Sequence, residues 1–273
     1  LLKNSQLDVY VTGSNARFLS KDVVTTFRGR GDEVRVHPLS FAEYLSVQQP
    51  LPFAEQHLNE YMRLGGLPQL VVMNSEQQKR QYLSQLFANT YLVDIKERYA
   101  IRNDADLEEL IDVIASSIGS LTNPTKIANS FASVKQSQLS KDTIKRYLDY
   151  MQDAFMIEKA VRYDIKGRKY IDTPAKYYFE DLGLRNARIN FRQTEPTHLM
   201  ENLIYNELRV KGYSIDVGQV VTNTRNANGV SERKQLEVDF VCNKADERIY
   251  IQSAYAMPTP EKQDQELKSL KLI

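Results

Sequence analysis

The sequence predicts an α/β protein with more than one domain, and three observations support this. Residues 1–50 alternate strand, turn, helix and strand, which is typical of an α/β layer. Residues 54–160 carry apolar side chains mostly at helical spacing, and the stretch from 187 to 273 combines a helix with several strands. Because a single core rarely extends much past roughly 200 residues, we divide the 273 residues at 1–50, 51–100, 101–186 and 187–273.

Composition excludes several classes of protein. The hydrophobic share of 42% and the charged share of 26% are ordinary for a soluble globular protein. A net charge of +1 gives no overall attraction to nucleic acid or acidic lipid, although local patches can still bind. No apolar run approaches the roughly 18 residues that a membrane span needs, so no membrane partner is expected. The single cysteine, Cys242, excludes a disulfide framework and fits a reducing cytoplasm.

The first segment carries polar side chains where a strand ends. A short strand over 9–11 leads into the turn Thr12-Gly13-Ser14-Asn15, and a predicted helix then leads to Arg28 and Arg30. A second strand ends at 38–41. No GxxxxGK[ST] loop occurs in the chain, so no backbone loop of that kind can hold phosphates here. The chain also begins at Leu1 rather than Met, and we expect a fragment of a longer protein whose nucleotide-binding strand and loop lie upstream.

The second segment, 51–100, is predicted to be a helical lid or linker. A helix over 55–64 should end at Gly65-Gly66-Leu67-Pro68, because glycine stops a helix and proline cannot continue it. A long helix is predicted over 77–98.

The third segment has the element order of a winged helix-turn-helix. A helix over 107–118 is followed by a short helix that starts at Asn123-Pro124, and Ser140 caps a third helix over 141–153. Strands over 156–163 and 170–179 then form a hairpin with a basic tip. Three helices followed by such a hairpin predict a winged helix.

Basic residues on this segment predict contact with the phosphates of duplex DNA. They are Lys141, Lys145, Arg146, Lys166, Arg168 and Lys169. The alternative is that these side chains solvate the outer face of a helical lid that contacts protein. Three aspartates on the same helix weaken the DNA interpretation, and sequence-specific readout is not predicted.

The last segment predicts a helix over 197–212 and strands over 214–221, 235–242 and 248–254, with a long hairpin loop over 222–233. Glu201 on the helix and Asp239 on the second of these strands resemble the acidic residues of the restriction-endonuclease-like fold. That resemblance implies Mg²⁺ held by Glu201 and Asp239. The third strand has Gln252-Ser253-Ala254, with a neutral side chain and no lysine two residues later. We therefore expect an inactive domain in which the two carboxylates hold metal weakly.

An ordered series of motifs resembles a large family of prokaryotic AAA-type P-loop ATPases. The motifs are TGSNA, RGR, HPLSFAEYL, GGLPQ, YLVDIKER, NPTKIAN, YFEDLGLRNA, MENLIYNELRVKGY and EVDFV…IYIQSAY. The resemblance covers almost the whole chain and implies that residues 1–50 are the C-terminal part of the ATPase domain. It also implies an upstream Walker A lysine and Walker B acid.

The same resemblance implies roles for residues of the first segment. Asn15 is expected to orient the attacking water or to sense the γ-phosphate, with Thr12 and Ser14 beside the nucleotide. Arg28 and Arg30 are expected to stabilise charge on the transferred phosphoryl group. An asparagine-capped turn and a solvated arginine pair are the alternative. ATP and Mg²⁺ belong to the full-length protein, and the fragment alone is expected to bind neither.

We therefore expect a fragment of an ATPase whose nucleotide state controls contact with DNA or with a protein partner. One alternative is a non-enzymatic winged-helix regulator that binds DNA. Another is a Mg²⁺-dependent nuclease that uses Glu201 and Asp239. The sequence upstream of Leu1 would separate the first hypothesis from the others, because an ATPase needs a phosphate-binding loop there.

Overall fold

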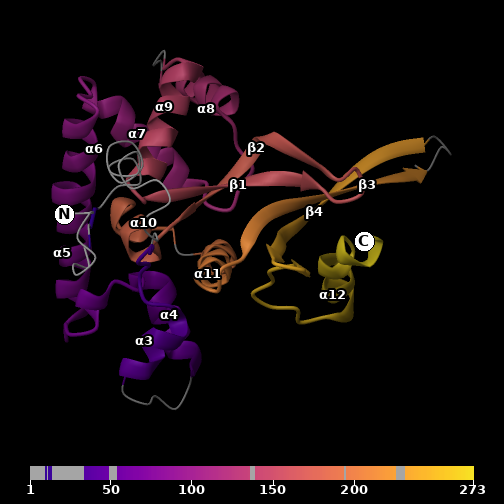
Figure 1. Ribbon diagram of the computed structural model, residues 1–273, viewed down its shortest axis with the longest axis horizontal. Coiled ribbons are helices and arrows are strands. Elements are labelled where there is room, and N and C mark those ends of the chain that lie inside the picture. Colours follow the sequence, from indigo (N-terminus) through magenta and orange to yellow (C-terminus); the bar gives the residue numbers. More distant parts are fainter. Residues whose placement is uncertain are drawn as a thin grey trace, which may run out of the picture.

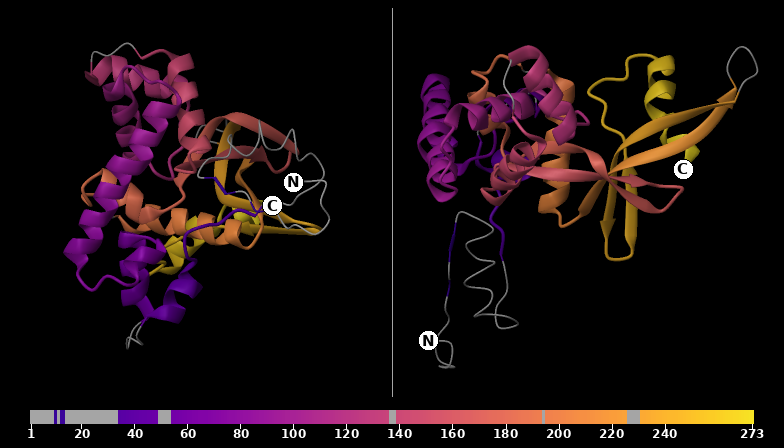
Figure 2. Two further views of the ribbon diagram at one scale, coloured as in Figure 1. Left: turned by 60° about the vertical axis from the view of Figure 1, so that its left-hand side comes forward. Right: turned by 90° about the horizontal axis from the view of Figure 1, so that it is seen from above.

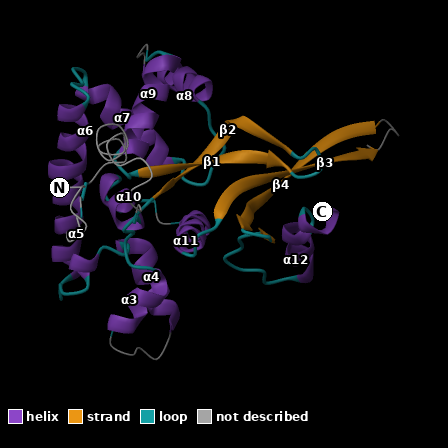
Figure 3. Ribbon diagram, viewed as in Figure 1, coloured by secondary structure: helices purple, strands orange, loops and turns teal. Residues whose placement is uncertain are grey.

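The computed structural model describes residues 10, 12–13, 34–48, 54–135, 139–193, 195–225 and 231–273. The predicted α/β class is confirmed: most helices gather at one side, and a five-stranded mixed sheet extends from them (Figure 1; Figure 3). Helix α12 (Pro260–Leu267) lies beside the sheet, away from this group. The same division is visible from two further sides in Figure 2.

The helices follow the predicted pattern closely. Their bounds are α3 (Phe41–Val47), α4 (Ala54–Leu64), α5 (Glu76–Leu86), α6 (Val93–Arg98), α7 (Asp104–Ser116), α8 (Pro124–Ser130), α9 (Lys141–Asp153), α10 (Leu182–Arg188), α11 (Pro196–Val210) and α12 (Pro260–Leu267). The helix predicted over 77–98 is continuous in path, but a π-helical turn at Phe87–Leu92 separates α5 from α6. Helices α3, α10 and α12 were not predicted. The strand predicted to end at 38–41 is wrong, because the described residues 34–40 form no strand and α3 begins at Phe41.

The predicted helix caps are confirmed. Asn123 accepts a hydrogen bond from the Lys126 backbone N–H at 2.7 Å, and Pro124 occupies the first helical position of α8. Ser140 accepts from the Thr143 backbone N–H at 3.1 Å at the start of α9. These local bonds explain why both helix starts were visible in the sequence.

The sheet has the strand order β2-β1-β3-β4-β5. The strands are β1 (Ile157–Asp164), β2 (Lys169–Phe179), β3 (Ser214–Arg225), β4 (Ser231–Lys244) and β5 (Glu247–Ile251). The predicted β1–β2 hairpin is confirmed, and β1 also pairs in parallel with β3. The hairpin is therefore part of one sheet that continues across position 187. The hairpin loop predicted over 222–233 is shorter than predicted, because β3 and β4 pair as far as Arg225 and Ser231.

Two apolar clusters form the core. The larger runs from Tyr44 to Leu203 and is built mainly from α4, α5, α7, α9 and α10. The smaller lies between α11 and the sheet and contains Ala160, Tyr178, Tyr205, Val217 and Phe240. Tyr177, Tyr178 and Phe179 at the end of β2 are buried. Within the described ranges, no helix is both long and apolar enough to cross a bilayer.

The start of α10 is fixed against the end of α4. Asp181 caps α10 by accepting from the Leu184 N–H at 2.9 Å, and it accepts from the Gly66 N–H at 2.8 Å. Asn186 donates to two carbonyl oxygens in the last turn of α4, at 3.0 and 2.9 Å. A Cβ at Gly183 would lie 1.9 Å from the Leu64 carbonyl oxygen. Segments more than 100 residues apart thus meet through backbone groups.

This close contact generates a stability prediction. Gly183→Ala should lower the free energy of unfolding by about 2–3 kcal/mol, because α10 and α4 must separate to admit the methyl group. Urea denaturation would measure the change. Gln78→Ala, at an exposed position of α5, is the control and should change stability by less than about 0.5 kcal/mol. Equal stability of the Gly183→Ala and wild-type proteins would contradict the contact.

Candidate functional site

The predicted nucleotide-site residues fall mostly outside the described residues. Ser14, Asn15, Arg28 and Arg30 lie there, and Thr12 is described as exposed. Their roles therefore stay predictions. The described stretch 34–48 shows how this segment is attached to the rest of the chain.

An ion-pair cluster attaches residues 35–37 to β1, to the end of β2 and to α11. Arg35 contacts Glu158 at 2.6 Å and also pairs with Glu180. Arg209 pairs with the same two carboxylates, at 3.2 Å from Glu158. The His37 Nδ1 lies 3.5 Å from the second oxygen of Glu180. Two arginines from distant parts of the chain thus share two glutamates.

Backbone hydrogen bonds extend the attachment to residue 41. The Leu39 N–H donates to the Gly66 carbonyl at 2.8 Å, and the Tyr61 hydroxyl donates to the Leu39 carbonyl. The Phe41 N–H donates to Glu207 at 2.7 Å. We call the contact of residues 35–41 with Gly66, Glu158, Glu180, Glu207 and Arg209 the joint.

Burial and the neighbouring charges shift the pKa values of the two glutamates of the joint, Glu158 and Glu180. Burial acts to raise the pKa of Glu180, but the hydrogen bond from His37 and the charges of Arg209 and Arg35 lower it to about 2. Burial is the largest effect on Glu158 and raises its pKa, against the two arginines. Glu180 therefore stays ionised at neutral pH and provides the anion that both arginines bind.

The predicted DNA-binding residues form two groups. Lys141, Lys145 and Arg146 are exposed on α9. Lys166, Arg168 and Lys169 are exposed at the hairpin tip, at the far end of β1 from α9. An eight-residue strand spans roughly 26 Å, and both views show the hairpin extending away from the helices (Figure 1; Figure 2). The structure does not bring the two groups together.

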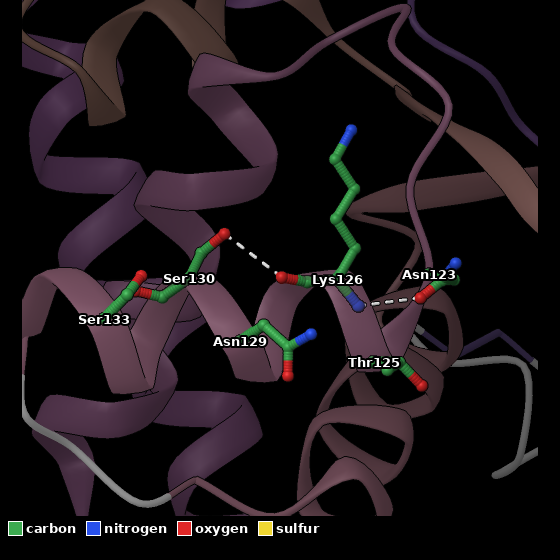
Figure 4. Close-up of a pocket in the computed structure, with 6 residues that line it drawn as sticks. All are labelled: Asn123, Thr125, Lys126, Asn129, Ser130 and Ser133. Atoms are coloured by element: carbon green, nitrogen blue, oxygen red, sulfur yellow. Dashed lines mark hydrogen bonds between the residues drawn. The ribbon is translucent and has the colours of Figure 1, made fainter.

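A polar hollow of about 480 Å³ lies along α8, next to the predicted recognition helix. Its lining is Asn123, Thr125, Lys126, Asn129, Ser130 and Ser133 (Figure 4). Lys126 is exposed and extends away from the helix in Figure 4. Neutral hydrogen-bonding side chains with one cation give a surface that water, phosphate or polar side chains can satisfy equally well.

Glu201 and Asp239 are brought together by a lysine. The Nζ atom of Lys176, on β2, lies 2.8 Å from Glu201 and 3.9 Å from Asp239. It lies 2.7 Å from Glu237, which precedes Asp239 by two positions on β4 and therefore shares its face of the sheet. Only 3% of the Lys176 side chain is exposed, whereas 36% of Glu237 is. We call Lys176, Glu201, Glu237 and Asp239 the carboxylate site.

Further hydrogen bonds orient the carboxylates. Tyr178 donates to the Glu201 oxygen that also binds Lys176, at 2.6 Å. Asp239 accepts from the Gln252 side chain at 2.9 Å and from the Ser253 N–H at 2.7 Å, both on its other oxygen. Gln252 therefore holds Asp239 in place. The neutral side chain at position 252 of the third strand thus contacts Asp239 by a hydrogen bond.

The pKa shifts at the carboxylate site follow from burial and from the excess of negative charge. Burial raises the pKa of Asp239 to about 6, and the Glu201 charge adds to this effect while Lys176 opposes it. Burial alone would lower the pKa of Lys176, but Glu201 and Glu237 raise it. The lysine thus stays an ammonium.

Lys176, Tyr178 and Glu237 were not predicted as site residues from the sequence. The available signal was a lysine inside the otherwise uncharged run Ala175–Phe179 of a strand, where an unpaired ammonium would be costly to bury. Glu237 was visible as the residue that shares a strand face with Asp239.

The carboxylate site does not fit the Mg²⁺ that its resemblance implies. Within the described ranges, no three His, Cys, Asp or Glu side chains are arranged to hold a metal ion. The Lys176 ammonium lies at salt-bridge distance from Glu201 and Glu237, between the oxygens that would be metal ligands. A divalent cation there would meet a like charge at contact distance.

Two known domains match parts of the chain. Residues 1–45 match an AAA domain, and residues 55–195 match a domain of unknown function, DUF8612. An uncharacterised protein of Haemophilus influenzae is 36% identical over 254 aligned residues, which cover 92% of this chain and 60% of that protein. An uncharacterised protein of Methanocaldococcus jannaschii is 27% identical over 287 aligned residues, covering 99% and 62%. The chain thus spans about three fifths of the length of these relatives. No solved structure matches it.

The raised pKa of Asp239 generates a pH prediction. The folded protein keeps this proton up to about pH 6, whereas the unfolded chain releases it near the ordinary value of 3.8. Unfolding therefore releases a proton in this window, and the Asp239 contribution to stability should fall as pH rises from about 4 to about 6. Asp239→Asn should remove this part of the pH dependence.

Urea denaturation at several pH values would measure the difference between the Asp239→Asn and wild-type proteins. Gln78→Ala, which removes no titratable group from an exposed position of α5, is the control and should leave the pH profile unchanged. Parallel profiles for Asp239→Asn and wild type would show that Asp239 titrates normally.

Proposed function

Because the chain belongs to the family of the domain of unknown function DUF8612, preceded by a stretch that matches an AAA domain, we propose that it is part of an AAA-type ATPase. In this proposal the ATPase domain binds ATP and Mg²⁺, and the joint passes its nucleotide state to the α11 and sheet region. Asn15 orients water or senses the γ-phosphate, and Arg28 and Arg30 stabilise the transferred charge.

The joint is the observation that carries the proposal. Residues 35–41 lie near the end of the stretch 1–45 that matches the AAA domain. They are fixed by ion pairs at Arg35 and by backbone hydrogen bonds at Leu39 and Phe41. Such a connection differs from a flexible linker, which would leave the nucleotide-binding domain free to move alone. A displacement of residues 35–41 must therefore break the joint or move α11.

We propose that the partner is contacted through α9 and that duplex DNA is its first candidate. The side chains of Lys141, Lys145 and Arg146 are exposed. None of them forms an ion pair with a carboxylate in the described part of the chain, so they remain available for phosphates. The hairpin tip, far from α9, would contact a separate stretch of the same backbone. A protein partner is the alternative, and salt-dependent binding separates the two.

The ATPase proposal is tested in the full gene product. ATP hydrolysis is expected, and Asn15→Ala should lower kcat by about 10²-fold, because the attacking water loses its orientation. A coupled assay of ADP release would measure the rate. Asn129→Ala, on α8, is the matched control and should leave kcat unchanged. A full gene product that has no phosphate-binding loop, or that hydrolyses no ATP, would refute the proposal.

The role of the joint has a separate test. Arg35→Ala should leave hydrolysis within about twofold of wild type while removing the nucleotide-dependent change in hydrogen exchange of α11. Arg63→Ala removes an exposed arginine paired with Glu76 between α4 and α5, and it should keep that change. Persistence of the α11 response in Arg35→Ala would show that coupling takes another route.

DNA contact is tested by binding at several salt concentrations. Wild-type binding to a duplex should weaken steeply with salt, and a Lys141→Ala/Lys145→Ala/Arg168→Ala variant should reduce the magnitude of the salt slope by up to about 3 and lower affinity for all sequences alike. Lys211→Ala, at an exposed site after α11, is the control. Absence of binding at low salt would favour a protein partner.

A further inference from the structure

The carboxylate site contains more negative charge than its single lysine can balance. Glu201, Glu237 and Asp239 all face Lys176, and within the described part of the chain no other lysine or arginine pairs with them. A buried lysine is normally unfavourable, but here its donors reach oxygens on α11 and β4. The lysine therefore links β2 to both of these elements.

The ligand chemistry around Lys176 is that of a hard divalent cation. Carboxylate oxygens of α11 and β4 lie 2.8 and 2.7 Å from the Lys176 Nζ atom, with Asp239 farther away at 3.9 Å, and carboxylates are the ligands that Mg²⁺, Mn²⁺ and Ca²⁺ prefer. The contacts of 2.7 and 2.8 Å are those of an ammonium, and they exceed the 2.0–2.6 Å typical of such metals. Metal and ammonium cannot occupy the same point, and two cations side by side would repel each other.

We propose that Lys176 is a built-in cation, whose ammonium occupies the position among Glu201, Glu237 and Asp239 that a divalent metal ion would take. The native site binds no divalent metal, and removal of the ammonium exposes a latent site for Mn²⁺ or Mg²⁺. This inference concerns a site other than the joint, and it does not rest on the proposed function.

The surrounding bonds support this assignment. The Asp239 oxygen that faces away from Lys176 is already bound by Gln252 and Ser253, so that the nearer oxygen keeps its direction without the lysine. Tyr178 likewise holds Glu201 independently of Lys176. The partial exposure of Glu237 gives an incoming ion a route from solvent. Glu201 and Asp239 would therefore keep their places after Lys176 is replaced by a neutral side chain of similar length.

The test compares Mn²⁺ binding by the wild-type chain and by Lys176→Met. The electron paramagnetic resonance signal of free Mn²⁺ would measure binding. Wild type should bind no Mn²⁺ that depends on Asp239, and Lys176→Met should gain affinity by at least about tenfold. Adding Asp239→Asn to Lys176→Met should remove the gain. Lys96→Met is the matched control, because Lys96 also bridges two carboxylates, Asp104 and Glu108, but on the helical surface.

Two outcomes overturn the inference. One is Mn²⁺ binding by the wild type that Asp239→Asn abolishes, because the native site would then hold metal beside the lysine. The other is a Lys176→Met protein with no gain in affinity. If Lys176→Met is poorly folded without metal, thermal melting decides: recovery of the melting transition by Mn²⁺ supports the built-in cation, and its absence overturns it.

Discussion

The structure depends on the buried carboxylate of Asp181. This side chain accepts from the Leu184 and Gly66 backbone N–H groups, and the Gly66 carbonyl in turn accepts from the Leu39 N–H. One carboxylate therefore orders the start of α10, the turn after α4 and the segment that ends the AAA-like stretch. Burial raises the pKa of Asp181 to about 6. The N–H donors act in the opposite direction, because they stabilise the charged form and offset part of the cost of removing it from water.

The residues around Asp181 extend this order in both directions along the chain. Glu180 is placed where both arginines of the joint reach it, and Asn186 binds the last turn of α4. Two residues before Asp181, the Phe179 N–H donates to the Asn202 side chain of α11, and the same side chain donates to the Phe179 carbonyl. The stretch from Lys176 to Asn186 is therefore where the sheet, the helical core and the joint meet.

The sequence predicted the elements that depend on neighbouring residues. Asn123 and Ser140 act on N–H groups three positions away, so the helices they start could be located without knowledge of the fold. The parallel pairing of β1 with β3 could not be located in this way. It joins residues more than 50 positions apart, with β2, α10 and α11 between the two strands.

The carboxylate site was predictable only in part for the same reason. Glu201 and Asp239 were identified by residue type and by their place on a helix and a strand. Lys176 lies 25 positions before Glu201, on a strand that was assigned to a different segment. The missing lysine of the third strand suggested a site without an ammonium, whereas the fold supplies one from β2. The interpretation of 101–186 and 187–273 as separate units concealed this contact.

Helix α11 connects the carboxylate site to the joint through a single face. Glu201 and Arg209 are eight residues apart, about two turns or roughly 12 Å along the axis. Tyr205 lies between them, stacks on Tyr178 with ring centroids 4.2 Å apart, and packs near the Arg209 guanidinium. Tyr178 in turn donates to Glu201.

This arrangement places two buried charge clusters on one helix, joined by packed aromatic rings. A helix with side chains fixed at both ends moves as a unit, because sliding it along the sheet would break the ion pairs of both clusters together. Lys176 therefore does more than balance charge: it holds α11 at Glu201, about two turns from the joint. A displacement of Arg35 that moves α11 must therefore also strain the pair between Lys176 and Glu201.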